Sequence, residues 1–333
     1  MRIRVESLLL LAFVALARAD LDAYEYDDEV ARLMLKLSAA AYNSRPEFCL
    51  AKLMPAEQDW RIFDQKEMPC DIKGNTCALY VSVSKIQRRL IVSFRGTVGK
   101  EQLDEETFES LQPDNDWYGM GLIDRYFYYA LNQTWPYVES ALAHPEFHQY
   151  HVTFTGYSLG GALASLASVK TVKLDFRPMY HVSLVTFGQP RVGNSIFANN
   201  HNRYVPNSYR IVHNADIVPH LPPCRDDGPY GCSRHDLNRA YHHGTEVWYK
   251  NDMSPGSNFM ICTRSDEDEH CSNSFGTKYT ANDHLHYFGH KVSSYGINNC
   301  TDVLGESGNN GMGMQKASLV TAVFSVIVAV LFM

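Results

Sequence analysis

The stretch that decides the fold covers residues 150–167 and reads YHVTFTGYSLGGALASLA. Its hydrophobic period changes in the middle: Val152 and Phe154 alternate with threonines as in a half-buried strand, whereas residues 162–167 place apolar side chains on one helical face. Between them lies the turn GYSLG, with Ser158 at its centre. A G-x-S-x-G turn between strand and helix exposes a nucleophilic serine. The sequence therefore predicts Ser158 as a nucleophile, with a purely structural turn as the alternative.

The glycines of this turn, Gly156 and Gly160, stand two residues on either side of Ser158. A tight reversal from strand to helix brings the two backbones together and leaves no room for a Cβ atom at these positions. Glycine is therefore expected there on steric grounds, and Gly161 extends the same clearance.

The composition is that of a globular protein and excludes one class of partner. The chain has 333 residues, of which 45% are hydrophobic and 20% are charged, and its formal net charge is -7. A negative chain is a poor partner for a nucleic-acid polyanion, so we expect no nucleic-acid binding. The length suits one α/β domain with terminal signals, and the charge leaves a lipid surface open as a partner.

Residues 1–19, MRIRVESLLLLAFVALARA, have the pattern of a secretory signal peptide. Two arginines precede a continuous apolar run, and Ala17-Arg18-Ala19 forms a small-residue cleavage site before Asp20. An amphipathic first helix would show a helical period, which this run lacks. We therefore exclude residues 1–19 from the fold and expect the chain to enter the secretory pathway.

The last part of the chain, residues 305–333, carries a second targeting pattern. A small, polar stretch around Ser307 and Gly308 precedes an uncharged apolar run, Ala317–Met333. This order predicts a GPI-attachment signal, with addition near Ser307 or Gly308. The alternatives are a C-terminal membrane helix, for which the run is short, and a buried terminal helix. The domain itself is then expected to cover residues 20–304, at the outer cell surface or outside the cell.

Eight cysteines follow the signal, and an even number in a secreted chain predicts disulfides. Many pairings are possible, and the sequence alone does not choose among them. We expect three short loops and one bridge between the ends of the domain: Cys70–Cys77, Cys224–Cys232, Cys262–Cys271 and Cys49–Cys300. Asn132-Gln133-Thr134 is a predicted N-glycosylation sequon, and Asn299-Cys300-Thr301 is a weaker one if Cys300 is bridged early.

Two regions before the turn have clear local patterns. Residues 28–42 place apolar side chains at helical spacing and predict a packing helix. Residues 78–84 and 89–94 are strand-like and predict a hairpin, which is followed by Arg-Gly-Thr with Thr97 last. In serine hydrolases with this strand-turn-helix arrangement, the loop after such a strand supplies one N–H of the oxyanion hole. The residue after the nucleophile, here Leu159, supplies the other.

Five motifs follow one another along the chain: SFRGT (93–97), GYSLGGALA (156–164), TFGQPRVGN (186–194), HNADIVPHLPP (213–223) and DHLHYFG (283–289). Together they resemble the class 3 lipases, the fungal triacylglycerol lipase type, over roughly residues 28–302. The resemblance implies a single-domain α/β-hydrolase fold with a central, mostly parallel sheet flanked by helices. It assigns Ser158 as nucleophile, Asp216 as acid and His284 as base of a triad. It also assigns Thr97 and the backbone N–H of Leu159 to the oxyanion hole.

On this resemblance, the expected activity is that of a secreted or cell-surface serine carboxylic-ester hydrolase. The simplest form is a lipase that hydrolyses acylglycerol esters at an interface through an acyl-enzyme, without cofactor or metal, while the C-terminal tail associates with the membrane. Two alternatives stay open. The same fold can carry a phospholipase A1 or a feruloyl-type esterase, and it can persist in a catalytically silent surface binding protein.

The residues themselves support the two assignments that lie far from the turn. Residues 209–213 are a short β-like run, so Asp216 lies just beyond a strand's carboxyl end, where open α/β sheets have their sites; a turn aspartate is the alternative. His284 completes the chain order Ser, Asp, His. We expect His284 and His286 on opposite faces of one strand, which disfavours a zinc group. Four other histidines are interpreted as structural or surface residues: His242, His243, His286 and His290.

Two further segments lie between the hairpin and the nucleophile turn. Residues 99–121 occupy the place where lipases of this family carry a lid, and Leu103, Phe108 and Leu111 would give a short helix there an apolar side. A solvated connector is the equal alternative, because the remainder is acidic. Residues 122–142 are rich in aromatic side chains, which we expect mostly in the core, with some lining the acyl site.

Overall fold

The structure is a computed structural model that describes residues 25–71, 74–98, 113–224, 232–276 and 278–302. Three predictions from the sequence lie outside the described residues. They are the signal peptide, the apolar side of the lid segment and the GPI-attachment signal.

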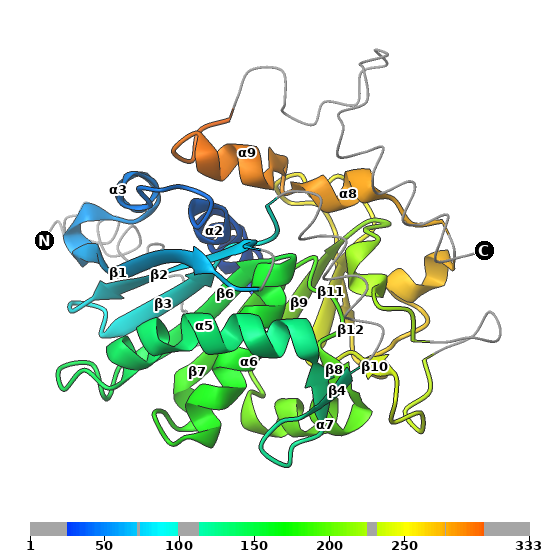
Figure 1. The fold of residues 1–333 in the computed structure, drawn as a ribbon. Coiled ribbons are helices and arrows are strands. Elements are labelled where there is room, and N and C mark those ends of the chain that lie inside the picture. The colour runs from blue at the N-terminus through cyan, green and yellow to red at the C-terminus, as the bar shows by residue number, and fades with distance from the viewer. Residues whose placement is uncertain (1–24, 72–73, 99–112, 225–231, 277, 303–333) are drawn as a thin grey trace, which may run out of the picture.

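An eight-stranded sheet forms the centre of the described chain (Figure 1). Its five middle strands pair in parallel, and antiparallel strands close both edges. The predicted hairpin is confirmed as β2 and β3, and the predicted central, mostly parallel sheet is confirmed. In spatial order the strands are β1 (Trp60–Pro69), β2 (Thr76–Ser84), β3 (Arg89–Phe94), β6 (His151–Tyr157), β7 (Val182–Phe187), β9 (Ser208–His213), β11 (Thr245–Tyr249) and β12 (Met260–Cys262).

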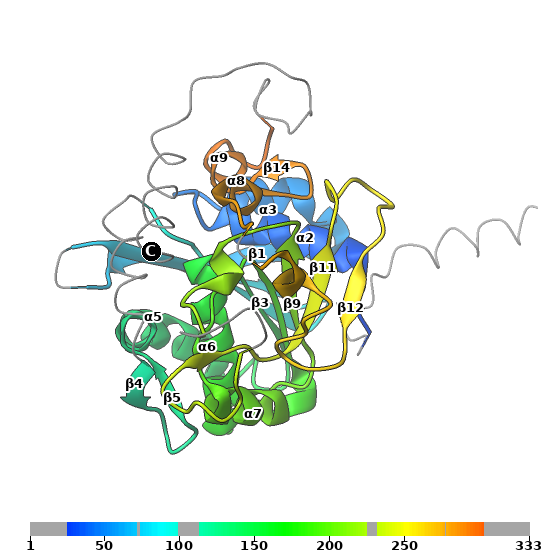
Figure 2. The same cartoon turned by 90° about the vertical axis from the view of Figure 1, so that its right-hand side faces the viewer.

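Helices cover both faces of this sheet because its inner strands are apolar on both sides. In β3, Leu90 and Val92 join the core that contains α5 (Arg125–Leu142) and α6 (Leu159–Lys173), whereas Ile91 joins the core that contains α2 (Asp28–Ala40). Successive side chains of a strand point to opposite faces, so a continuous apolar run needs cover on both. Figures 1 and 2 show the helices of the two layers: α2 (Asp28–Ala40) with α9 (Val292–Ile297) beyond it, and α5 (Arg125–Leu142) with α6 (Leu159–Lys173).

Shorter elements connect these layers, and a four-stranded sheet has the order β10-β8-β5-β4. The remaining elements are α3 (Glu47–Leu53), η2 (Ala56–Gln58), β4 (Pro113–Asp116), β5 (Leu122–Asp124), η3 (Met179–His181), β8 (Gly193–Asn194), α7 (Ser195–Tyr204), η4 (Val218–His220), β10 (Ala240–Tyr241), η5 (Ser272–Phe275), α8 (Ala281–Leu285), β13 (His286–Tyr287) and β14 (His290–Lys291).

The predicted packing helix of residues 28–42 is confirmed as α2. Asp27 precedes it, and its side chain accepts hydrogen bonds from the N–H groups of Glu29 (2.8 Å) and Val30 (3.1 Å). Such a cap gives partners to N–H groups that have none inside the helix, which fixes where the helix begins. It ends at Ala40, slightly before the predicted end.

The aromatic segment of residues 122–142 divides into β5 and α5. Tyr126, Phe127 and Trp135 are buried in the core beside the sheet, whereas Tyr129 is exposed. The expectation that most of these rings belong to the core is therefore confirmed.

Four disulfides cross-link the fold, and all four predicted pairings are confirmed. Cys49–Cys300 joins α3 to the turn after α9, across a sequence separation of 251. In the chain-entropy view, closing so long a loop restricts the unfolded chain and stabilises the fold by about 5 kcal/mol. The other three close short loops: Cys70–Cys77, Cys224–Cys232 and Cys262–Cys271.

The first predicted sequon lies inside α5. Asn132 is exposed, but Thr134 is fully buried and its hydroxyl donates to the carbonyl oxygen of Ala130 at 3.0 Å. Glycosylation of Asn132 stays a prediction, and it would have to occur before the helix buries Thr134. In the second sequon, Cys300 is in a disulfide.

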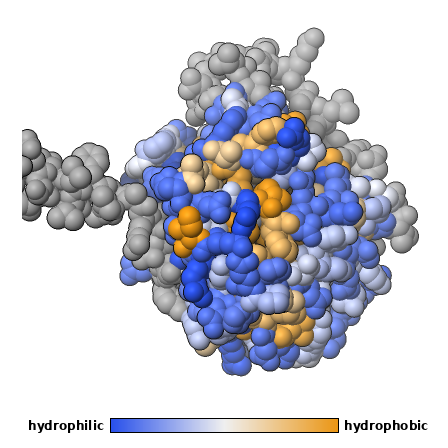
Figure 3. Space-filling model, turned by 90° about the vertical axis from the view of Figure 1, so that its left-hand side faces the viewer, coloured by the Kyte–Doolittle hydropathy of each residue, from blue (hydrophilic) through white to orange (hydrophobic). Residues whose placement is uncertain are grey.

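The outer surface shows no single dominant apolar area in the view of Figure 3, where apolar patches are separated by hydrophilic side chains. Scattered apolar side chains are ordinary on a folded protein, so this face alone does not define an interface. No helix in the described part of the chain is both long and apolar enough to cross a membrane.

Candidate active site

The turn between β6 and α6 holds Ser158 in an unusual backbone conformation, with φ 58° and ψ -130°. A positive φ is strained for a residue with a side chain, and such strain is concentrated at functional sites. The predicted steric need for glycine is confirmed: a Cβ atom on Gly156 would lie 2.1 Å from the carbonyl oxygen of Gly160, and one on Gly160 would lie 2.3 Å from that of Phe94. Close packing thus holds Ser158 at the carboxyl end of β6.

Three predicted site residues meet at this turn. The Nε2 atom of His284 lies 3.0 Å from the Oγ atom of Ser158, and its Nδ1 atom lies 2.9 Å from Oδ2 of Asp216. All three side chains are buried. Because an ionised carboxylate only accepts hydrogen bonds, Nδ1 carries the proton, and Nε2 is left to accept from the serine hydroxyl. The arrangement has the geometry of a nucleophile, a base and an orienting acid.

Asp216 follows β9, as the sequence predicted, and its carboxylate is held from several sides. Its Oδ1 accepts from the N–H of Val218 at 2.9 Å, and its Oδ2 accepts from the hydroxyl of Tyr287 at 2.6 Å. Burial, and then the charge of Asp216, raises the pKa of Tyr287 well above its ordinary value, so this hydroxyl stays protonated and donates.

His284 is brought to the site by a helix, and our expectation of a strand was wrong. It lies in α8, while His286 begins β13. Thr280 caps α8, since its hydroxyl accepts from the N–H of Asp283 at 3.0 Å. The Oδ2 atom of Asp283 in turn accepts from the backbone N–H of Ala215 at 3.1 Å, next to Asp216. The spacing Thr-x-x-Asp was the signal for this helix start in the sequence.

The two predicted oxyanion-hole residues come from two elements: Leu159 directly follows the nucleophile, and Thr97 lies in the loop after β3. Leu159 is the first residue of α6, where helix N–H groups lack partners inside the helix. Thr97 follows Gly96, whose added Cβ atom would lie 3.2 Å from Cβ of Ser158. The loop after β3 therefore passes directly beside Ser158. The role of Thr97 and Leu159 in stabilising an oxyanion belongs to the proposal below.

The other histidines interpreted as structural or surface residues stay outside this triad. His242 and His243 are buried, with Nε2 atoms 2.7 Å from the carbonyl oxygen of Pro219 and 2.7 Å from Oγ of Ser165. His286 and His290 are partly exposed. Two of the four residues are thus buried and hydrogen-bonded, and two lie partly at the surface, while their lack of a catalytic role stays a prediction.

A buried ion pair fixes the loop that follows Asp216. Arg191 and Glu267, each 2% exposed, form two hydrogen bonds of 2.8 and 2.9 Å. Arg191 also donates from Nη1 to the carbonyl oxygen of Pro222 at 3.0 Å, and Glu267 accepts from the N–H of His242 at 2.8 Å. A two-pronged contact of this kind is both strong and geometrically specific. No sequence pattern predicts this pair, because its members lie far apart in the chain.

Gly188 packs against the acid and the base. Its φ is 55°, and a Cβ atom there would lie 2.8 Å from Oδ2 of Asp216 and 2.9 Å from Cε1 of His284. We expect Gly188→Ala to displace this pair and to lower kcat about a hundred-fold, the usual effect of misplacing a catalytic group by about 1 Å. Steady-state hydrolysis of a monomeric ester measures this.

The control for this prediction is Gly256→Ala. Gly256 has a φ of 78° but nothing within 4 Å of an added Cβ, so it shares the backbone strain without the clash. An equal loss of kcat in both variants would show that backbone strain, and not contact with the triad, causes the effect.

His201 in α7 makes stability depend on pH. Burial lowers its pKa from 6.5 to about 3, so the ring is neutral in the folded protein over this interval, while the unfolded chain takes up a proton. Above pH 6.5 the ring is neutral in both the folded and the unfolded chain, so its effect on stability is complete there. As the pH falls below 6.5, protonation of the unfolded chain lowers the free energy of unfolding by about 1.4 kcal/mol per pH unit, down to about pH 3. We expect His201→Leu to have a shallower acid dependence of its denaturant midpoint than the parent; parallel curves would contradict this.

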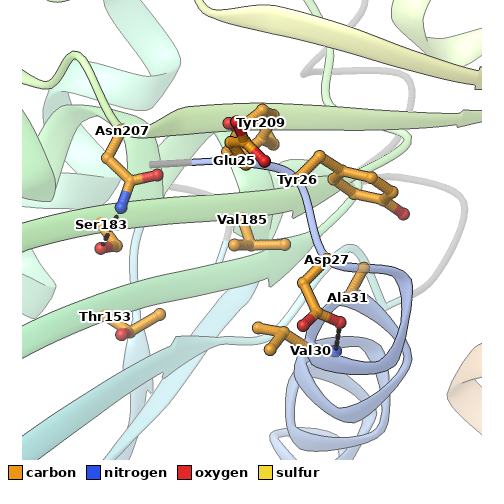
Figure 4. Close-up of a pocket in the computed structure, with 10 residues that line it drawn as sticks. All are labelled: Glu25, Tyr26, Asp27, Val30, Ala31, Thr153, Ser183, Val185, Asn207 and Tyr209. Carbon is orange, nitrogen blue, oxygen red and sulfur yellow. Dashed lines mark hydrogen bonds between the residues drawn. The ribbon is translucent and has the colours of Figure 1, made fainter. Parts of the chain in front are cut away.

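The cavity in Figure 4 lies apart from the triad. It is lined by Thr153 near the start of β6, Ser183 near the start of β7 and Asn207 before β9, whereas Ser158 follows the end of β6. Asn207 donates from Nδ2 to Oγ of Ser183 at 2.8 Å within it. Its volume is about 30 Å³. Pockets for small-molecule ligands usually measure roughly 300–1,000 Å³, so this cavity offers no room for a lipid.

The fold and the contacts of Ser158, His284 and Asp216 define the geometry of an α/β-hydrolase that uses serine. The chain belongs to the class 3 lipase family, as the sequence motifs predicted. The family profile described as lipase (class 3) matches residues 91–226. The protein is therefore a serine hydrolase of the triacylglycerol lipase type.

Known relatives agree with this membership. The chain is 38% identical to "Lipase ZK262.3" of Caenorhabditis elegans over 293 residues, which is 83% of each chain. It is 39% identical to a Rhizopus niveus lipase over 165 residues, or 48% of this chain and 36% of that protein.

Solved structures are similar over most of the chain. Lipase II from Rhizopus niveus has a TM-score of 0.62 at 28% identity over 78% of this chain and 94% of its own. A fungal lipase–inhibitor complex has a TM-score of 0.66 at 25% identity over 82% and 97%.

Proposed function

We propose that this protein is a secreted or cell-surface lipase that hydrolyses acylglycerol esters with Ser158 as nucleophile, His284 as base and Asp216 as acid. The observation that carries the proposal is the continuous hydrogen-bonded path from Oγ of Ser158 through both ring nitrogens of His284 to Asp216, at 3.0 and 2.9 Å. A serine hydroxyl is a poor nucleophile by itself, and such a path activates it.

In the proposed reaction, Oγ of Ser158 attacks the ester carbonyl carbon while Nε2 of His284 takes the hydroxyl proton. The tetrahedral intermediate then expels the alkoxide, which leaves as an alcohol with that proton, and the acyl group stays on Ser158. Water repeats the sequence: His284 takes its proton, the hydroxide attacks the acyl carbon, and Ser158 leaves with the proton as a carboxylic acid is released. Asp216 stays ionised and stabilises the imidazolium that forms twice.

The negative charge of each tetrahedral intermediate needs fixed donors. The N–H of Leu159 at the start of α6 and the N–H and hydroxyl of Thr97 are the proposed donors, because Leu159 directly follows Ser158 and Thr97 directly follows Gly96, which packs against Ser158. Loss of a single donor of this kind typically lowers kcat by about 10²- to 10³-fold.

Acylglycerols are the proposed substrates because of the relatives. One relative, 30% identical over 148 residues, is named a secreted mono- and diacylglycerol lipase from Fusarium solani. An extracellular location is also supported by four disulfides, which persist in oxidising compartments. Phospholipase A1 and feruloyl-type esterase remain the alternative activities of the same site.

A fluorophosphonate probe and an ester panel test this function. We expect the probe to label Ser158 in the folded, oxidised protein, and peptide mapping identifies the site. We also expect emulsified acylglycerols to be cleaved faster than phospholipids or feruloyl esters. Absence of labelling would support a silent binding protein, and a reversed order of rates would replace the substrate class and leave the triad standing.

The proposed chain organisation has a signal peptide at residues 1–19, the hydrolase domain at 20–304 and a GPI-attachment signal at 305–333. Treatment of intact cells with phosphatidylinositol-specific phospholipase C tests the anchor. Released, active enzyme is the expected result, whereas enzyme that stays on the membrane would favour a spanning C-terminal helix.

A further inference from the structure

Tyr157, the residue directly before the nucleophile, makes two contacts with the proposed base. Its hydroxyl donates to the main-chain carbonyl oxygen of His284 at 2.7 Å. Its ring also stacks on the imidazole of His284, with centroids 4.8 Å apart and planes 22° from parallel. The side chain is only 5% exposed, so both contacts are made without competition from water.

The main-chain contact serves a group that would otherwise lack a helical partner. His284 is the fourth residue of the five-residue helix α8, and the last carbonyls of a helix have no N–H four residues further on inside it. Burial raises the pKa of the Tyr157 hydroxyl well above its ordinary value, so this hydroxyl remains a donor. The end of α8 is thus tied to β6, the strand that directly precedes Ser158.

The ring contact fixes the plane of the imidazole. Hydrogen bonds from Nδ1 to Asp216 and from Ser158 to Nε2 define one axis of the His284 ring, but they leave rotation about that axis open. The face of Tyr157 restricts this rotation, and the backbone of Gly188 restricts the Cε1 edge. An aromatic face also attracts a cation, so it favours the imidazolium that forms during the reaction.

We propose that Tyr157 is a positioning residue for the reaction, which ties α8 to β6 through the carbonyl of His284 and sets the plane and the charge preference of the His284 ring. The inference rests on the proposed function. Residue 157 is the variable position of the G-x-S-x-G turn, and the sequence alone predicts no role for it, because the contact joins residues 127 apart in the chain.

Two substitutions separate the two contacts. Tyr157→Phe keeps the ring and removes the hydroxyl, so we expect kcat to fall about ten-fold with little change in KM and in the pH profile. Tyr157→Leu removes both contacts. We expect a larger loss of kcat and a shift of the acid limb of kcat/KM to lower pH by about 0.5 to 1 unit, because the imidazolium loses its aromatic partner.

In the described part of the chain, the titratable groups around the imidazole come from several elements and stay the same in these variants. They are Asp216 after β9, Tyr287 in β13, which donates to Asp216, and more distant Tyr42 after α2 and His213 in β9, whose rings lie against Tyr157 and Tyr287. A change of the acid limb on loss of the Tyr157 ring is therefore assigned to that ring.

Tyr80→Phe is the matched control. Tyr80 in β2 is also buried, and its hydroxyl donates to the carbonyl oxygen of Leu37 at 2.7 Å, away from the triad. The two phenylalanine variants should lose similar stability in thermal unfolding, but only Tyr157→Phe should lose kcat.

The outcomes distinguish this inference from the proposed function. If the parent protein neither hydrolyses esters nor reacts with the fluorophosphonate, the proposed function fails. If the parent is active and Tyr157→Phe and Tyr157→Leu keep its kcat and its pH profile, the positioning role of Tyr157 is wrong while the triad stands.

Discussion

Replacement of Ser158 by alanine should lower kcat for ester hydrolysis about a million-fold and leave the fold intact. Without Oγ there is no atom to form the acyl-enzyme, and in a triad that acts as a unit the loss of the nucleophile costs about as much as the loss of all three members. Residual hydrolysis would come from binding and the oxyanion donors alone. The measurement is steady-state hydrolysis of a soluble ester, with circular dichroism to verify folding.

Asp216→Asn should act on the same path with a smaller loss, about ten-thousand-fold in kcat. An asparagine amide in place of Oδ2 no longer accepts the proton of Nδ1, so His284 is held in the tautomer that cannot take the serine proton. Combining Asp216→Asn with Ser158→Ala should add little to the loss in Ser158→Ala, because both changes interrupt one path. Multiplicative losses would mean that the two residues act independently.

The chain contains a matched control for this experiment. Ser165 in α6 lies 2.7 Å from Nε2 of His243, which is closer than Ser158 to His284. Ser165 and His243 are completely buried, so no substrate reaches them. Ser165→Ala should therefore keep kcat. Loss of activity there equal to that of Ser158→Ala would mean that the active pair has been assigned to the wrong serine.

The comparison of these two serine–histidine pairs shows what local sequence can predict. Ser158 could be predicted because consecutive residues form the turn on which its chemistry depends. This turn has glycine on both sides of the serine, and the hydrophobic period changes across it. Nothing in the sequence marks Ser165 as a neighbour of His243, since that contact follows from packing of α6 against a distant loop. The order of strand, turn and helix in residues 150–167 was predictable for the same reason, because the change of hydrophobic period lies within one short segment.

Other parts of the site depended on tertiary structure. The resemblance assigned His284 as the base, and the structure places it beside Ser158 and Asp216. Its helix was missed because residues 283–287 suggested the alternation of a strand, whereas the Thr-x-x-Asp cap begins a short helix there. Tyr157 and Tyr287 lay inside recognised motifs, but their roles depend on which carbonyl and which carboxylate they reach. Sequence spacing does not carry that information, because the partners come from other elements.

The stability of the fold also depends on the buried ion pair of Arg191 and Glu267, which anchors the loop after Asp216. Burial alone raises the pKa of Glu267, but the charge and hydrogen bonds of Arg191 more than offset this and lower the pKa below its ordinary value. The pair is therefore charged, and each member relies on the other for its charge to be tolerated in the interior. Substitution of one member leaves the other unpaired.

We expect Glu267→Gln to destabilise the protein by about 3–5 kcal/mol, because it leaves the Arg191 guanidinium buried without its counter-charge. The matched control is Glu47→Gln. Glu47 meets Arg45 at 2.9 Å, nearly the distance of the buried pair, but the side chains are 46% and 62% exposed, so water replaces the lost partner and the cost stays below about 1 kcal/mol. Thermal or denaturant unfolding of the oxidised proteins measures both.

Equal losses of stability in the two variants would mean that the short distance between the charges, and not their burial, makes the protein depend on the pair. A lower unfolding midpoint in Glu267→Gln, with full activity under conditions where the variant is still folded, would show that the pair stabilises the fold without positioning Asp216. A parallel loss of kcat would mean that the loop after Asp216 needs this ion pair to hold the carboxylate against His284.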